Sequence, residues 1–211
     1  TLFPYTTLFR SGGREQKIFW SAAGIFFFYI ETFTDNLLSK VGGILMNVGL
    51  ERKEFDNVDA KLVNPFIDAF ISVMPQIGFP TPKRIKVYLQ NKTVNSSGVI
   101  VSIGFTRQLK GKVAYNMNED TAKFIASTMM MGMPVAEFDE MAQSAIAEMA
   151  NMLTATSATN LTALDLSVDI SPPSLTVGAQ PFTISDAQFL VVEMDLGGHK
   201  VDIAVSVDRA A

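Results

Sequence analysis

The sequence has no cysteine and only one histidine, His199. The absence of cysteine excludes disulfides, thiolate nucleophiles and cysteine-ligated zinc. A single histidine excludes a multi-histidine metal site and leaves little basis for a Ser-His-Asp triad. His199 lies in the glycine-rich stretch 196–200, between two strand-like runs. We therefore expect its side chain to be exposed to solvent in a turn.

The chain also has no excess of basic residues. It carries 17 Lys and Arg against 21 Asp and Glu, a net charge of −4. Nucleic-acid binding needs a basic surface, and so does binding to an anionic membrane, so we expect neither partner. Glycine-rich phosphate-binding motifs of the G-x-G-x-x-G and G-x4-G-K-[S/T] types are absent, which leaves nucleotide binding without support. These features favour a cytoplasmic protein.

The first residues do not read like the rest of the chain. Residues 1–11 resemble a translated sequencing-adapter oligonucleotide, and none of the 11 methionines precedes Met46. Segments of this kind are set aside when a fold is inferred. We predict that residues 1–45 are a non-native leader and that 46–211 form a single domain.

A targeting segment is the alternative for the same region. Arg10, Arg14 and Lys17 precede an apolar run over residues 18–30, an order that resembles a signal peptide. The run is too short to cross a bilayer, which takes about 20 residues. No small-residue cleavage site follows it cleanly, which favours the leader interpretation.

From Met46 onward, apolar periodicity predicts alternating short elements. A helix is expected over residues 60–74, another begins at 118–120 and extends to Gly132, and a third covers 138–153. Strands are expected over 84–89, 99–105, 111–116, 166–170, 189–194 and 201–207, with Gly197 and Gly198 turning the last hairpin. About six mainly antiparallel strands packed with three helices define an α+β fold.

A methionine run closes the second helix at Met129, Met130 and Met131. Flexible thioethers fill irregular gaps in cores, and they also form adaptable binding surfaces. We expect core packing here, with a binding face as the alternative.

The third predicted helix carries a polar pattern, S-x3-E-x2-N. A helix turns about 100° per residue, so Glu148 lies ~40° and Asn151 ~20° from Ser144 on the helical wheel. The three polar residues therefore share one narrow stripe, which we expect to be exposed. The opposite face is expected to be buried and carries Ile146, Met149 and Leu153.

This helix resembles the signature helix of the CheX/CheC/FliY chemotaxis phosphatases. Two further segments agree with that family, in the same order along the chain: Asn64-Pro65-Phe66-Ile67 at the start of a helix, and Ser171-Pro172-Pro173-Ser174 with Gly178 before the last strands. The resemblance covers about residues 58–207. Only one copy of the signature is present, which favours the single-site CheX type. One departure is Thr156-Ser157-Ala158, where the family has a small Gly-Asn-Ala-like turn.

The resemblance implies a CheC/CheX-like fold and a phosphatase acting on the phosphoaspartate of a CheY-like response regulator in chemotaxis. It implies that Asn151 orients the attacking water, that Glu148 docks the regulator, and that Ser144 lines the interface. It implies no cofactor of the chain's own, with Mg2+ held by the partner regulator. A homodimer through sheet edges is also implied, and the low-charge last strands would be suitable edges. The alternative is a non-catalytic adaptor domain in the flagellar switch or in two-component signalling.

Overall fold

The computed structural model describes residues 6–11, 14–19 and 60–210. The chain divides into two compact units, Thr1–Arg52 and Lys53–Ala211. In the first unit, β1 (Thr6–Ser11) and β2 (Arg14–Phe19) form an antiparallel pair. The predicted boundary at Met46 lies outside the described residues, so the division into leader and domain stays a prediction.

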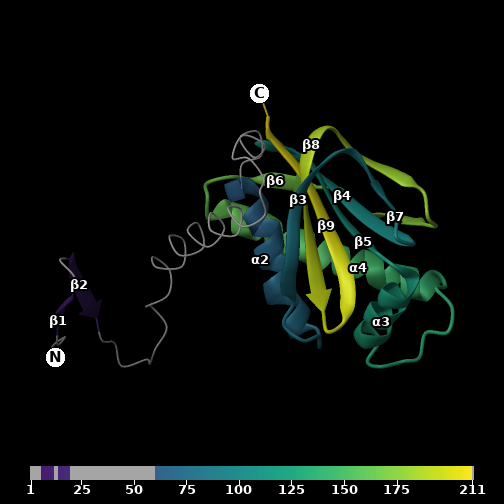
Figure 1. Ribbon diagram of the computed structural model, residues 1–211, viewed down its shortest axis with the longest axis horizontal. Coiled ribbons are helices and arrows are strands. Elements are labelled where there is room, and N and C mark those ends of the chain that lie inside the picture. Colours follow the sequence, from purple (N-terminus) through teal and green to yellow (C-terminus); the bar gives the residue numbers. More distant parts are fainter. Residues whose placement is uncertain (1–5, 12–13, 20–59, 211) are drawn as a thin grey trace. The chain divides into compact units, whose positions relative to one another are not determined.

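The second unit is an α+β domain in which three helices pack on an antiparallel sheet (Figure 1). The sheet has seven strands in the order β3-β8-β9-β5-β4-β6, and β7 also pairs with β4. The predicted fold class is confirmed, with one strand more than expected. The elements are α2 (Ala60–Gln76), β3 (Lys83–Asn95), β4 (Val99–Arg107), β5 (Leu109–Met117), α3 (Glu119–Met129), α4 (Glu140–Thr162), β6 (Val168–Ile170), β7 (Ser174–Val177), β8 (Pro181–Leu196) and β9 (His199–Arg209).

The helices all pack on one face of the sheet, because the side chains of one main core come from all three helices and from a single face of the strands. The opposite face has a smaller apolar cluster of its own, whose residues all come from the strands β3, β4, β5, β8 and β9. Its buried members are Val94, Ile100, Ala114, Ile184, Phe189, Val191 and Ala204. The three helices therefore cover one face of the sheet, and the smaller apolar cluster lies on the other face.

The β8–β9 hairpin turns where the sequence predicted. Leu196 pairs with His199, so the loop consists of Gly197 and Gly198. Their φ angles are 66° and 91°, the left-handed values that a two-residue hairpin turn requires and that glycine adopts without a steric cost. The Asp195 carboxylate accepts a hydrogen bond from the Gly198 amide at 2.9 Å and fixes the turn.

The strand β7 was not predicted. It follows Pro172 and Pro173, and it pairs with the first half of β4 while β6 pairs with the second half. Proline cannot donate to a ladder, so the proline pair divides one edge of the sheet into two short strands. Each piece is too short to give a clear alternating pattern in the sequence.

The sheet edges also differ from the expectation for a dimer. β8 and β9 are interior strands, each paired on both sides, whereas β3 lies at one edge of the sheet. The expectation that the last strands offer free edges is therefore wrong. The low charge of these strands fits their interior position, because both contribute side chains to an apolar cluster on each face of the sheet.

Candidate functional site

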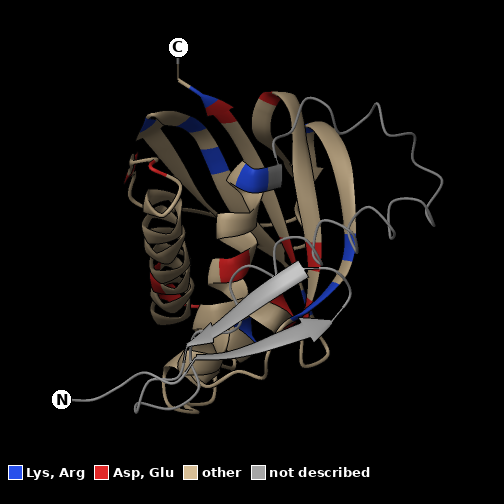
Figure 2. Cartoon of the chain, turned by 90° about the vertical axis from the view of Figure 1, so that its left-hand side faces the viewer, with Lys and Arg blue, Asp and Glu red and all other residues tan. Residues whose placement is uncertain are grey.

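The signature stripe lies on α4, the longest helix of the described residues, at 23 residues. Asp139 is its N-cap, and its carboxylate accepts a hydrogen bond from the Ala142 amide at 2.9 Å. That bond satisfies one of the amides that a helix leaves unpaired at its start. Figure 2 shows acidic and no basic residues on this helix, in agreement with its sequence.

The buried face of α4 is the face that the sequence predicted to be buried. Ile146, Met149 and Leu153 are buried, together with the small residues Ala142 and Ala150. These side chains belong to the main core and pack toward α2, α3 and the sheet. Burial of this face fixes which residues of the helix point outward.

The outer face carries the three signature residues. Ser144 and Glu148 are exposed, as expected, and Asn151 is half-buried. Within residues 60–210, none of the three side chains makes a hydrogen bond or an ion pair. A carboxylate and a carboxamide one turn apart are thus both available to an outside partner.

The segment that departs from the family pattern does not interrupt α4. Thr154 and Ser157 are buried, and their hydroxyls donate to the carbonyls of Ala150 and Leu153, each at 2.8 Å. Such bonds to the preceding turn satisfy buried hydroxyls inside a helix. The helix continues to Thr162, so Asn151 lies in its middle and not at a frayed end.

Two expectations about which side chains are buried and which are exposed are wrong. Met131 does not pack in the core: its side chain is 99% exposed, although Met129 packs against the main core. His199 is half-buried and stacks on Phe124, with ring centroids 3.9 Å apart and planes 8° apart. The hairpin brings the first residue of β9 against α3, a contact between segments far apart in sequence that no local pattern reveals.

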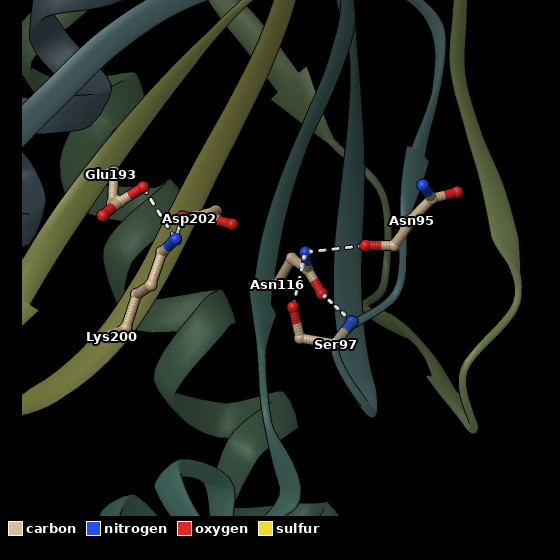
Figure 3. A network of polar contacts seen from close by, with 6 residues as sticks. All are labelled: Asn95, Ser97, Asn116, Glu193, Lys200 and Asp202. Carbon is tan, nitrogen blue, oxygen red and sulfur yellow. Dashed lines mark hydrogen bonds and ion pairs between the residues drawn. The ribbon is translucent and has the colours of Figure 1, made fainter.

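A second polar cluster lies on the sheet face away from the helices (Figure 3). Lys200 pairs with Glu193 at 2.7 Å and with Asp202 at 3.8 Å, a distance too long for a hydrogen bond. Burial raises the pKa of the Asp202 carboxyl, Lys200 opposes the rise and Glu193 adds to it. Nearby, the Asn116 carboxamide binds the Ser97 amide at 2.9 Å and the Asn95 carbonyl at 3.1 Å.

Neither a metal site nor a membrane span emerges in the part of the chain that the structure describes. It holds no group of three or more His, Asp or Glu side chains able to ligate a metal ion. No helix in the same residues is both long and apolar enough to cross a bilayer.

The fold itself defines a class of protein. A CheC-like superfamily protein from Shewanella sp. PV-4 superposes with a TM-score of 0.64 and 22% identity, covering 72% of this chain and 99% of that one. The CheX chain in the CheX-CheY-BeF3-Mg2+ complex from Borrelia burgdorferi superposes with a TM-score of 0.54 and 22% identity, covering 70% and 98%. The domain has the fold of the CheC/CheX group.

Sequence comparison narrows the class to a family. The family model described as chemotaxis phosphatase CheX matches residues 99–195. The CheY-P phosphatase CheX of Thermotoga maritima is 31% identical over 121 residues, which are 57% of this chain and 78% of that protein. The chain belongs to the CheX family of chemotaxis phosphatases. It is accordingly a protein phosphatase, a hydrolase, and the resemblance inferred from the signature helix is confirmed.

Proposed function

We propose that this protein hydrolyses the phosphoaspartate of a CheY-like response regulator in chemotaxis signalling. The observation that carries the proposal is the unpaired Glu148 and Asn151 on the outer stripe of α4 in a chain of the CheX family. The Thermotoga relative is named for dephosphorylating CheY-P, and the Borrelia CheX was crystallised with CheY, BeF3 and Mg2+. These proteins suggest the substrate class for this one.

Asn151 is assigned to orienting the attacking water. Phosphoryl transfer depends on positioning and charge stabilisation more than on covalent help from the protein. A carboxamide accepts a hydrogen bond from water through its oxygen and donates another through its nitrogen. It brings no negative charge toward the phosphoryl oxygens. Holding the water in line with the leaving carboxylate lowers the activation barrier of hydrolysis, by roughly several kcal/mol when the geometry is good.

Glu148 is assigned to docking. A carboxylate on the phosphoryl group itself would repel it, so the productive position is beside a cation of the regulator. A charge-assisted bond to such a cation, a lysine in the partner's active site, would fix the register of α4 on the partner. Ser144 is one turn away on the same stripe and is assigned to the interface.

The remaining parts of the proposal concern cofactors, assembly and location. We assign no cofactor to this chain and place the Mg2+ in the acidic pocket of the regulator, next to the phosphoryl group. We propose a homodimer and a cytoplasmic location, where response regulators work. In such a dimer, β3 would be a candidate edge because one side of it has no strand partner among the described residues.

A non-catalytic adaptor domain of the same fold is the alternative. An adaptor would bind the regulator without shortening the lifetime of its phosphate. The pairing of a carboxylate and a carboxamide on one unpaired stripe favours the enzyme, because binding alone does not need a group that orients water.

The test is the decay of a phosphorylated CheY-like receiver domain, with Mg2+ present and at matched protein concentrations. The wild-type protein should accelerate the decay, and Asn151→Ala should largely abolish the acceleration. Ala155→Ser, on the exposed stripe of the same helix, is the matched control and should behave as wild type. Full acceleration by Asn151→Ala would show that another group positions the water. Receiver binding without any acceleration by the wild type would establish the adaptor.

A further inference from the structure

The hydroxyl group of Tyr115 is buried without a partner. The side chain is 0% exposed and lies in the main core, and its oxygen makes no hydrogen bond among the described residues. Buried polar groups in proteins are almost always bonded, because burial removes the water that would otherwise bind them. One other buried side-chain oxygen of the same residues is unpaired, on Asp202, and Lys200 lies 3.8 Å from it. The Tyr115 hydroxyl thus destabilises the folded state, and its presence needs a reason other than stability.

The ring of Tyr115 is held in place by packing that does not use the hydroxyl. β5 is an interior strand, and Tyr115 is paired with Val101 of β4 and Ile203 of β9. From the helix layer, Phe70 of α2 stacks on the ring, with centroids 6.5 Å apart and planes 20° apart. A phenylalanine would make the same apolar contacts and would leave no polar atom to satisfy. The core alone therefore does not require a tyrosine at this position.

The group that faces the hydroxyl is Thr154 on α4. Burial raises the pKa of the Tyr115 phenol, and the Thr154 hydroxyl opposes the rise, which places the two oxygens near one another. Thr154 is buried as well, and its hydroxyl donates to the Ala150 carbonyl at 2.8 Å. A hydroxyl has one proton, so the Thr154 oxygen is left as an acceptor, and the Tyr115 hydroxyl is the donor that matches it. The two groups do not form a hydrogen bond in the free protein, and a small movement of α4 would complete one.

Thr154 and Asn151 lie on the same side of α4. Thr154 follows Asn151 by three residues, so it lies ~60° away on the helical wheel and about 4.5 Å further along the axis. Asn151 is half-buried, unlike the exposed Ser144 and Glu148, so it is the signature residue at the margin of the buried face. α4 is a continuous helix through both positions. A shift of α4 that brings Thr154 onto Tyr115 therefore moves the Asn151 carboxamide with it.

We propose that Tyr115 is a positioning residue for Asn151. During hydrolysis its hydroxyl donates to the Thr154 oxygen and holds α4 at the depth where Asn151 orients the attacking water, and the free protein lacks this bond. The inference rests on the proposed function. An interaction made only in the reacting complex accelerates the chemical step, and a misplacement of about 1 Å costs on the order of 10²-fold in rate. The proposal also accounts for a hydroxyl that destabilises the free protein, since such local costs recur at functional sites.

The test is Tyr115→Phe, which removes only the hydroxyl. The decay of a phosphorylated CheY-like receiver domain with Mg2+ gives kcat and KM, and fluorescence anisotropy with the beryllofluoride-loaded receiver gives Kd. Tyr115→Phe should lower kcat about tenfold, as expected for the loss of one hydrogen bond made in the transition state, and leave KM and Kd within about twofold. Its Tm should be unchanged or higher, because an unpaired buried hydroxyl has been removed.

Thr154→Val removes the acceptor and keeps the shape of the side chain. It should lower kcat by a similar factor, and the double variant with Tyr115→Phe should lower kcat no further, because both changes break the same contact. Ser157→Ala is the matched control. It removes another buried hydroxyl of α4, which donates to the Leu153 carbonyl at 2.8 Å, and it should lower Tm without changing kcat.

A wild-type kcat for Tyr115→Phe would overturn the inference and leave the proposed function standing. So would a double variant in which the two losses multiply, since the two hydroxyls would then act separately. A raised KM with an unchanged kcat would also overturn it, because the hydroxyl would then act in docking. A wild-type protein that does not accelerate the decay would overturn the proposed function and this inference together.

Discussion

The Asn160 carboxamide of α4 donates a hydrogen bond to the carbonyl oxygen of Pro65 on α2, at 3.1 Å. Pro65 lies inside α2, where its ring removes one amide from the helical ladder. The bond joins the two helices on the side of α4 that faces away from Ser144, Glu148 and Asn151. One side of α4 is therefore bonded to α2, and the opposite side carries the three signature residues.

Asn160→Ala should lower the free energy of unfolding by about 1 kcal/mol, because one partly buried hydrogen bond is lost. The kcat for receiver dephosphorylation should not change, since the signature stripe is untouched. Urea denaturation and phosphate-decay kinetics on the same preparation measure both effects. Thr159→Ala, at the neighbouring exposed position, is the control and should alter neither. A loss of kcat with Asn160→Ala would mean that its bond to Pro65 also positions the stripe.

Asp202→Asn should stabilise the protein at neutral pH. Burial raises the folded-state pKa of this carboxyl, so the folded protein holds the proton more tightly than the unfolded chain does. The contribution of Asp202 to stability is therefore fully present below its unfolded pKa and is lost as pH rises through the folded pKa. The amide variant escapes that loss, so its Tm should exceed that of wild type at pH 7 and approach it in acid.

Asp208→Asn is the control for the same chemical change on β9, because Asp208 is exposed. Its Tm should follow wild type at every pH. A lower Tm for Asp202→Asn at pH 7 would show that the attraction between Lys200 and Asp202, 3.8 Å apart, outweighs the cost of burying the carboxylate.

Local patterns were sufficient for the elements whose burial follows their own periodicity. The helix over residues 60–74 and the Gly197-Gly198 hairpin were predicted within a few residues, because an apolar stripe and a glycine turn are local signals. The first half of β8 was not predicted. Residues 181–188 mix polar and apolar side chains, and they form a strand because they pair with the end of β3, about ninety positions earlier in the chain.

In the candidate site, too, the features set by local sequence were predicted and those set by tertiary contacts were not. Helical spacing alone placed Ser144, Glu148 and Asn151 on one outward stripe opposite a buried one. The exposure of Met131 was not predictable from composition. Met131 follows α3 with a left-handed backbone conformation, and its side chain points away from the core. The position of His199 was missed because its ring contacts Phe124 only after the β8–β9 hairpin has packed on α3.

Deleting residues 1–45 should leave Tm and dephosphorylation unchanged. Among the described residues of the second unit, the buried core begins with Leu62 and Val63 of α2. Differential scanning calorimetry of the full chain and of 46–211 measures the effect. A control deletion to residue 68, which removes the first half of α2, should unfold the domain. A fall in Tm for 46–211 would mean that the leading segment contributes to the fold, and the interpretation as a non-native leader would be wrong.

Glu148→Gln should weaken docking more than chemistry. The amide keeps the shape of the side chain but loses the charge that pairs with a cation of the regulator, a contact worth about 1.5–3 kcal/mol. KM should therefore rise by one to two orders of magnitude, roughly, while kcat falls much less. Glu140→Gln, an exposed acid in the first turn of the same helix, is the matched control and should change KM only slightly. The loss should shrink at high salt, where screening already weakens the pair in the wild-type protein. An unchanged KM together with a collapsed kcat would place Glu148 at the reacting phosphoryl group and remove it from the docking role.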